Sequence, residues 1–132
     1  MKYLDDALEM IRIGLTTLEP SEKDAMNVEV VAEEIITNII SYAYDEDSNA
    51  IDKYVEVELH IDKASNKIFI LFKDSGRPYN PLEKADPDFE LDIMDRPIGG
   101  LGIYMTKKLM DKITYEYSEG LNILSIEKVI KN

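Results

Sequence analysis

Residues 67–76 read KIFILFKDSG. The five apolar residues 68–72 form an uninterrupted run, which ends at Asp74, Ser75 and Gly76. A short apolar run bounded by turn-forming residues predicts a strand, and one that is apolar at every position predicts a central strand covered on both faces. We therefore place this strand in the middle of a sheet.

The residues before this strand predict a second strand with one solvated face. Apolar residues at positions 55, 57, 59 and 61 alternate with Glu56, Glu58 and His60. Alternation with a period of two is typical of a strand that packs on one side only. Residues 63–67 between the two strands predict a turn.

Two amphipathic helices are predicted upstream. Leu4, Leu8, Ile11, Leu15 and Leu18 recur every three to four residues, and Pro20 and Ser21 end this first helix. A longer helix is predicted over about residues 24–43, where apolar residues form a wide arc. A polar stretch, residues 45–52, then predicts a loop.

After the central strand, the sequence first loses its periodic spacing of apolar residues and then regains it. Residues 77–98 have no clear period and contain four prolines. An irregular stretch of about 20 residues within a compact domain is uncommon and is often a functional lid, here about residues 80–98. Helical spacing resumes over residues 101–110, and two strands joined at Gly120 are predicted over residues 113–117 and 121–129.

This order of elements predicts an α/β (α+β) two-layer sandwich. About three helices would cover one face of a mainly antiparallel mixed sheet. A length of 132 residues predicts a single domain over residues 1–132.

The composition argues against several classes of protein, including nucleic-acid-binding and membrane-spanning proteins. The net charge of −12 disfavours nucleic acid as a partner, because like charges repel. No apolar run approaches the ~20 residues of a membrane span, and the first residues do not form a basic secretory leader. Cysteine is absent, which excludes disulfides and a thiolate metal site and agrees with a cytoplasmic location.

The first candidate motif is Glu34-Ile-Ile-Thr-Asn38 in the second predicted helix. A spacing of four puts both side chains on one face, beside the apolar arc. A carboxylate at the edge of a core can act as a general base, and an amide oxygen can bind Mg²⁺. Taken alone, such a pair more often consists of solvated surface residues with no role in a site.

The second motif starts with Asp74 and Gly76, at the end of the most apolar strand. A carboxylate there can accept a hydrogen bond from the exocyclic amine of adenine, and Gly76 would allow a flat ring to lie against backbone. Taken alone, such a motif is more often a simple turn that ends a strand.

The third motif is Gly99-Gly100-Leu101-Gly102-Ile103, which opens a predicted helix. Glycines allow close backbone approach, and a helix N-terminus offers unpaired N–H groups to phosphates. The motif matches neither a Walker loop nor a dinucleotide fingerprint, and a flexible hinge is the alternative. Three such motifs in one order are much rarer by chance than any one of them.

Together, residues 32–44, 74–81 and 96–111 resemble the N, G1 and G2 boxes of the GHKL (Bergerat-fold) ATPases. Within that superfamily the chain is similar to the stand-alone anti-sigma-factor and serine-kinase branch, over nearly its whole length. Tyr42 stands where His is common in the family. The chain also begins close to the first helix, which leaves little room for the N-terminal strand often used in dimers, so a homodimer is left open.

The resemblance implies ATP and Mg²⁺ as ligands, held beneath a lid. By position, Glu34 would be the general base, Asn38 the Mg²⁺ ligand and Asp74 the acceptor for adenine, with Gly76 shaping the pocket. The remaining nucleotide-binding positions implied by the resemblance are Arg96, Gly99, Gly100, Leu101, Gly102 and Ser125.

The function implied is that of an ATP-dependent protein-serine kinase. Its acceptor would be an anti-anti-sigma (STAS) protein and its other partner a sigma factor. The alternative is a non-catalytic adaptor whose partner binding depends on nucleotide. A coincidental α/β domain, which would bind no adenine nucleotide, is the third possibility.

Overall fold

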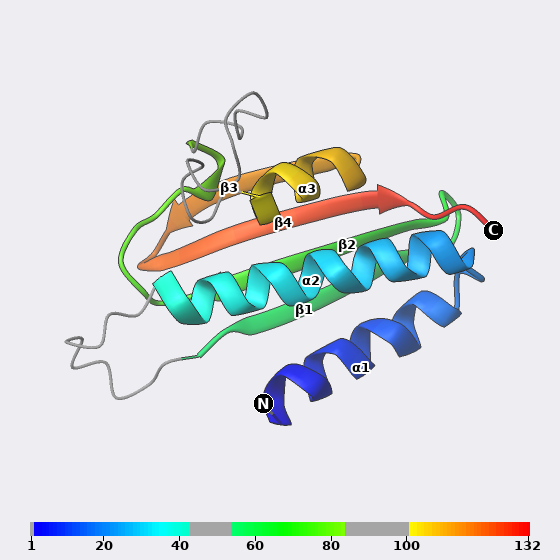
Figure 1. The fold of residues 1–132 in the computed structure, drawn as a ribbon, viewed down its shortest axis with the longest axis horizontal. Coiled ribbons are helices and arrows are strands. Elements are labelled where there is room, and N and C mark those ends of the chain that lie inside the picture. The colour runs from blue at the N-terminus through cyan, green and yellow to red at the C-terminus, as the bar shows by residue number, and fades with distance from the viewer. Residues whose placement is uncertain (1, 43–53, 84–100) are drawn as a thin grey trace, which may run out of the picture.

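The structure, a computed structural model, describes residues 2–42, 54–83 and 101–132 (Figure 1). Its elements in chain order are α1 (Lys2–Thr16), α2 (Glu22–Tyr42), β1 (Glu56–Asp62), β2 (Lys67–Asp74), the short 3₁₀ helix η1 (Pro81–Glu83), α3 (Leu101–Leu109), β3 (Lys112–Ser118) and β4 (Leu121–Val129). The four strands form one sheet in the order β1-β2-β4-β3, and each neighbouring pair is antiparallel. The three α-helices lie against one face of this sheet. The predicted two-layer sandwich is confirmed.

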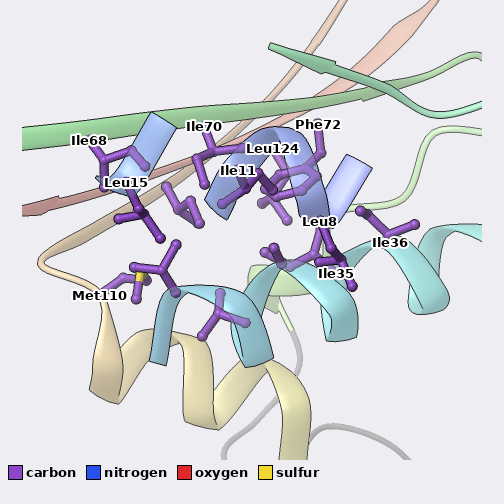
Figure 2. Close-up of a cluster of buried hydrophobic side chains, with 14 of the residues drawn as sticks. Leu8, Ile11, Leu15, Ile35, Ile36, Ile68, Ile70, Phe72, Met110 and Leu124 are labelled. Atoms are coloured by element: carbon purple, nitrogen blue, oxygen red, sulfur yellow. The ribbon is translucent and has the colours of Figure 1, made fainter. Parts of the chain in front are cut away.

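The buried core lies between the helices and the sheet (Figure 2). Even-numbered residues of β2 and β4 face the helices, and the inward residues Ile68, Ile70 and Phe72 of β2 are almost fully buried. They pack with the apolar arcs that the spacing in α1 and α2 predicts. The core is completed by Leu8, Ile11, Leu15, Leu18, Val28, Val31, Ala32, Ile35, Ile36, Met110, Leu124, Ile126 and Ile130.

β2 is central, as predicted, but its second face is not covered by another layer among the described residues. Its odd-numbered side chains are half-buried, including Phe69 and Leu71. Flanking ion pairs on this outer face join Lys73 to Glu58 at 2.8 Å and Lys67 to Glu127 at 2.7 Å. Long lysine side chains can cover apolar surface with their methylene groups while keeping their charge in water. A continuous apolar run was therefore misleading about the second face.

The helix layer is tied to the sheet at the end where β4 finishes. Ser21 begins α2 by accepting a hydrogen bond from the N–H of Asp24 at 3.2 Å, as an N-cap does. Asp24 in turn accepts from the N–H of Lys131 at 2.7 Å, and the N–H of Ser21 donates to the Lys131 carbonyl at 2.8 Å. This end of the sandwich is held together by the chain after β4.

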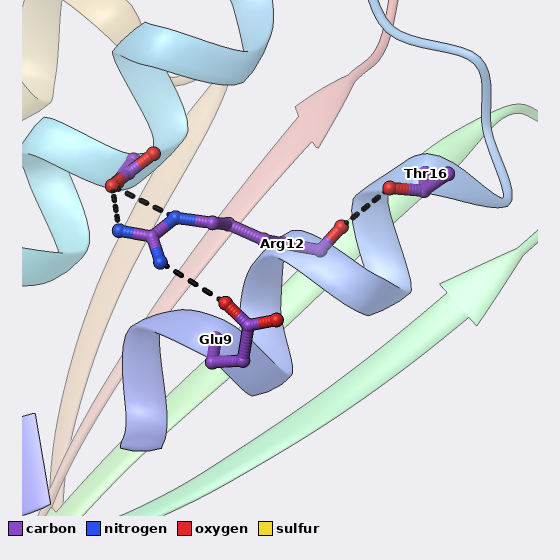
Figure 3. Close-up of polar contacts among 4 residues, drawn as sticks. Glu9, Arg12 and Thr16 are labelled. Atoms are coloured by element: carbon purple, nitrogen blue, oxygen red, sulfur yellow. Dashed lines mark hydrogen bonds and ion pairs between the residues drawn. The ribbon is translucent and has the colours of Figure 1, made fainter. Parts of the chain in front are cut away.

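Arg12 joins α1 to α2 on their exposed side (Figure 3). Its Nε donates to Glu29 Oε1 at 3.0 Å, and its Nη1 donates to Glu9 at 3.1 Å. The bond from Arg12 lowers the pKa of Glu29. Since the guanidinium is half exposed, water screens the pair, and it contributes more to helix orientation than to stability.

None of the helices in the described ranges is both long enough and apolar enough to cross a membrane.

Ile70→Val is expected to lower the free energy of unfolding by about 0.5–1.5 kcal/mol, because it removes one methylene from a fully buried site. Urea unfolding measures this as a shift of the midpoint with unchanged slope. The matched control is Ile13→Val on α1, where Ile13 is 62% exposed and the change should stay within about 0.5 kcal/mol. Equal effects at both positions would contradict the assignment of β2 to the core.

Candidate functional site

The described residues of the three candidate motifs lie toward one end of the sandwich. β2 ends there, β4 begins there, and the first turn of α3 meets the C-terminal half of α2 (Figure 1). This is the end opposite to the one closed by the chain after β4. Contacts within this region define two groups of residues. Glu34, Asn38 and Gly102 lie on the helices, and Asp74, Gly76 and Asn122 lie at the ends of β2 and β4.

Glu34 and Asn38 form the first group, on α2. Asn38 Nδ2 donates to Glu34 Oε1 at 3.3 Å, and both side chains are half-buried. The spacing of four therefore places them on one face beside the core, as predicted. The bond uses the amide nitrogen of Asn38, whereas a metal ion would bind the amide oxygen.

Gly102, in the first turn of α3, packs directly on Glu34. A Cβ at position 102 would lie 2.2 Å from Glu34 Oε1 and 2.3 Å from Glu34 Cγ, which is closer than atoms can approach. Only glycine lets Glu34 occupy this place. The sequence predicted a glycine for close approach to phosphate, which stays a prediction; the structure shows that this glycine makes room for the Glu34 carboxylate.

Thr106 holds the beginning of α3 in the core. It is fully buried, and its hydroxyl donates to the Gly102 carbonyl at 2.8 Å. The hydroxyl thus has its hydrogen-bond acceptor within α3. The buried Thr106 side chain holds the turn that carries Gly102 against the core.

Asp74 is the centre of the second group, at the end of β2. It is only 3% exposed, and its Oδ1 accepts from the N–H of Gly76 at 3.0 Å and from Asn122 Nδ2 at 3.0 Å. Burial raises the pKa of Asp74, because it disfavours the charged form, and the two hydrogen bonds oppose that rise. A buried carboxylate supported in this way is suited to accept a hydrogen bond from a ligand.

Asn122, near the start of β4, connects this group and was not singled out in the sequence. Its Nδ2 also donates to the carbonyls of Gly76 at 3.3 Å and Arg77 at 2.9 Å. Its Oδ1 accepts from the N–H of Tyr79 at 3.1 Å and from the Tyr115 hydroxyl. The signal available in the sequence was a polar residue at the head of the inward series 122, 124, 126, whose other members are apolar.

Ser125, predicted to lie near adenine, is not brought to Asp74. Asp74 pairs with Asn122 in the β2–β4 register, whereas Ser125 pairs with Leu71. Even-numbered residues of β4 lie in the core beneath the helices, so the odd-numbered residues lie on the outer face of the sheet. Ser125 and Asp74 therefore occupy opposite faces.

The other predicted site residues lie before α3. α3 begins at Leu101, so the glycine motif does open a helix, as predicted. Arg96, Gly99 and Gly100 lie outside the described residues. Of the predicted lid, only residues 80–83 are described. There Leu82 N–H donates to Asn80 Oδ1 at 2.9 Å as η1 begins.

Comparison with known proteins shows which proteins this sequence is similar to. The family model described as "Histidine kinase-like ATPase domain" matches residues 3–128. "Serine-protein kinase RsbW" of Staphylococcus aureus, strain JH9, is 28% identical over 116 residues, which cover 82% of this chain and 67% of that protein. The protein of the same name from strain Newman matches equally.

Proposed function

The chain belongs to the histidine kinase-like ATPase family, and on that premise we propose that it binds ATP and phosphorylates a serine of a partner protein. The observation that carries the proposal is the pairing of two chemically different groups at one end of the sandwich. One is a buried carboxylate that can accept from adenine, and the other is a carboxylate–amide pair beside a helix N-terminus.

Asp74 is proposed to select the adenine base. Its Oδ1 is engaged by Gly76 and Asn122, and neither of these bonds occupies Oδ2. That oxygen can accept from the exocyclic amine of adenine. A buried acceptor distinguishes strongly between adenine and other bases, because a base without a matching donor leaves the acceptor without a hydrogen bond.

The phosphates are proposed to lie toward Glu34, Asn38 and the first turn of α3. The N-terminus of a nine-residue helix favours negative charge, and Gly102 allows backbone to approach a ligand closely. By family resemblance, Arg96, Gly99, Gly100 and Leu101 contribute to the same region.

Asn38 is proposed as a ligand of Mg²⁺. No cluster of three or more acidic or histidine side chains suited to a metal exists among residues 2–42, 54–83 and 101–132. One amide oxygen fits Mg²⁺, which commonly binds through few protein ligands together with substrate phosphates and water. Bound there, the ion would neutralise charge on the phosphates.

Glu34 is proposed as the general base. It would take the proton of the acceptor serine hydroxyl as that oxygen forms a bond to the γ-phosphorus. The bond from the γ-phosphorus to the bridging β–γ oxygen then breaks, and ADP leaves. Positioning and charge stabilisation contribute most of the acceleration in this type of reaction, and the base orients the nucleophile.

The partners proposed are an anti-anti-sigma (STAS) protein as acceptor and a sigma factor as client. The support is the family resemblance and the relatives named serine-protein kinase. Phosphorylation of the acceptor would then decide which partner the kinase holds. A purified cognate STAS protein that binds but gains no phosphate from ATP would overturn this part of the proposal.

Asp74→Asn is expected to weaken ATP binding by about 1–2 kcal/mol, which is roughly tenfold. The amide keeps an oxygen for the N–H of Gly76 and for Asn122, but it presents an NH₂ group where adenine also presents a donor. Calorimetric titration of ATP with and without Mg²⁺ measures the change.

The matched control is Asp62→Asn. Asp62 also ends a strand and also accepts from the N–H two residues on, at 3.0 Å, but it lies at the other end of β2's hairpin. Its replacement should leave ATP affinity unchanged. If the wild-type protein binds no adenine nucleotide under any condition, the proposed function is wrong.

A further inference from the structure

The side chain of Asn122 uses its full hydrogen-bonding capacity. Its two N–H groups are shared among three acceptors, namely Asp74 Oδ1 and the carbonyls of Gly76 and Arg77. Its oxygen accepts two bonds, from the Tyr79 N–H and the Tyr115 hydroxyl. The residue is 5% exposed, so these bonds are made away from water. Five partners on one small side chain are more than packing requires.

The orientation of this amide is determined by its partners. A backbone N–H can only donate, so the atom that faces Tyr79 must be the oxygen of Asn122. The nitrogen is then turned toward Asp74 and the two carbonyls. An ionised aspartate at this position could accept from Tyr79 and Tyr115, but it could not donate to Asp74.

These bonds tie three segments to one side chain of β4. Asp74 ends β2, residues 76–79 form the turn that follows, and Tyr115 lies on β3. The bond from Asn122 to Asp74 spans 48 positions in the chain. The direction of the Asp74 carboxylate and the path of the 76–79 turn are therefore both set from β4.

We propose that Asn122 is a positioning residue for base selection: by donating to Asp74 Oδ1 it keeps Oδ2 as an acceptor directed at the 6-amino group of adenine, and so sets the preference for adenine over 6-oxopurines. This inference rests on the proposed function, because it assigns Asn122 a role in the same nucleotide site. Asn122 does not touch the reacting phosphates and acts through Asp74.

Asn122→Asp is the informative substitution, because it has the same shape and retains the acceptor for Tyr79 and Tyr115. The new carboxylate would face Asp74 across the 3.0 Å gap that the amide now bridges. Two carboxylates at such a distance cannot both be ionised, so one of them takes up a proton. When Asp74 Oδ2 carries that proton, it donates to the 6-oxo group of inosine triphosphate (ITP) and no longer accepts from the 6-amino group of adenine. Bound ITP favours this position of the proton, so the adenine preference would decrease.

The experiment is calorimetric titration of the full chain with MgATP and with MgITP. In the wild type, ATP should bind at least about tenfold more tightly than ITP, since a hydrogen-bonding site rejects a base that lacks its partner group. In Asn122→Asp this ratio should fall below about threefold. Tyr115→Phe keeps the donor that faces Asp74 and should hold the ratio within about twofold of wild type.

The matched surface control is Thr114→Ala, an exposed residue on the outer face of β3, which should change neither affinity. If Asn122 has only a structural role, Asn122→Asp should weaken the binding of ATP and of ITP equally. The ratio of the two affinities would then be unchanged, and that result would overturn the inference. If Asn122→Asp does not fold, Asn122→Ala supplies the same comparison of ratios. A wild-type protein that binds ATP and ITP with equal affinity overturns the inference, whereas one that binds neither overturns the proposed function.

Discussion

Glu34→Gln is expected to slow phosphoryl transfer to the acceptor serine by about 10²–10⁴-fold, the usual contribution of a general base. Glutamine keeps the length of the side chain, and its amide can still contact Asn38 and lie over Gly102. It cannot take a proton from the serine hydroxyl. ATP affinity should therefore change by less than about threefold, because the substitution removes an interaction made chiefly in the transition state.

The measurement is single-turnover transfer of γ-phosphate to a purified cognate STAS protein, together with calorimetry of ATP. The control is Glu33→Gln, the neighbouring carboxylate on α2, which is exposed and points away from Glu34's face of the helix. It should transfer phosphate at the wild-type rate. If Glu34→Gln keeps both the transfer rate and partner regulation, Glu34 is not the base. If the wild type regulates its partner without any transfer, the non-catalytic adaptor is correct.

Gly102→Ala is expected to reduce transfer about a hundredfold, because a displacement of about 1 Å in a catalytic group can cost that much. The new methyl group would occupy the space of the Glu34 carboxylate, 2.2 Å from its present Oε1. Glu34 is a flexible side chain and can swing aside, so the fold should survive. Alanine is also a better helix former than glycine by about 1 kcal/mol, which offsets part of the strain.

A double-mutant cycle with Glu34→Gln tests this explanation. If Gly102 acts by placing Glu34, the double variant should be little slower than Glu34→Gln alone. Independent, multiplying losses would instead indicate that Gly102 acts mainly on the phosphates.

The chain also offers a matched glycine control. A Cβ at Gly14 on α1 would lie 2.3 Å from Leu59 Cδ2, a clash of similar severity that involves no site residue. Gly14→Ala should lower stability by about 1–3 kcal/mol through overpacking and leave the transfer rate of the folded protein unchanged.

Local patterns in the sequence predicted the layers well. The spacing of apolar residues located α1 and α2 with ends shifted by about two residues, as is usual for helix boundaries. The spacing of Glu34 and Asn38 predicted their contact, because i and i+4 positions on a helix are neighbours whatever the rest of the fold does. The family match over residues 3–128 agrees with the three-box resemblance.

The sequence predicted less well where a contact depends on strand register. The family resemblance implied Ser125 as the polar side chain of β4 near adenine, whereas pairing with β2 brings Asn122 opposite Asp74. Alternation along β4 separates the face of Asn122 from that of Ser125, but only the register shows which residue lies opposite Asp74. The same applies to Gly102, whose contact with Glu34 depends on the distance between two helices that are far apart in sequence.

The order β1-β2-β4-β3 also has a consequence for how the molecule folds. β1–β2 and β3–β4 are hairpins closed by short turns, and each can form from nearby residues. The β2–β4 pairing is the long-range closure, and it carries the larger entropic cost of joining distant segments. Asp74 and Asn122 lie opposite each other across this closure. A chain with both hairpins formed but not yet joined would hold its strands and lack the proposed adenine acceptor. On the proposed function, nucleotide would therefore bind only molecules in which β2 and β4 have paired.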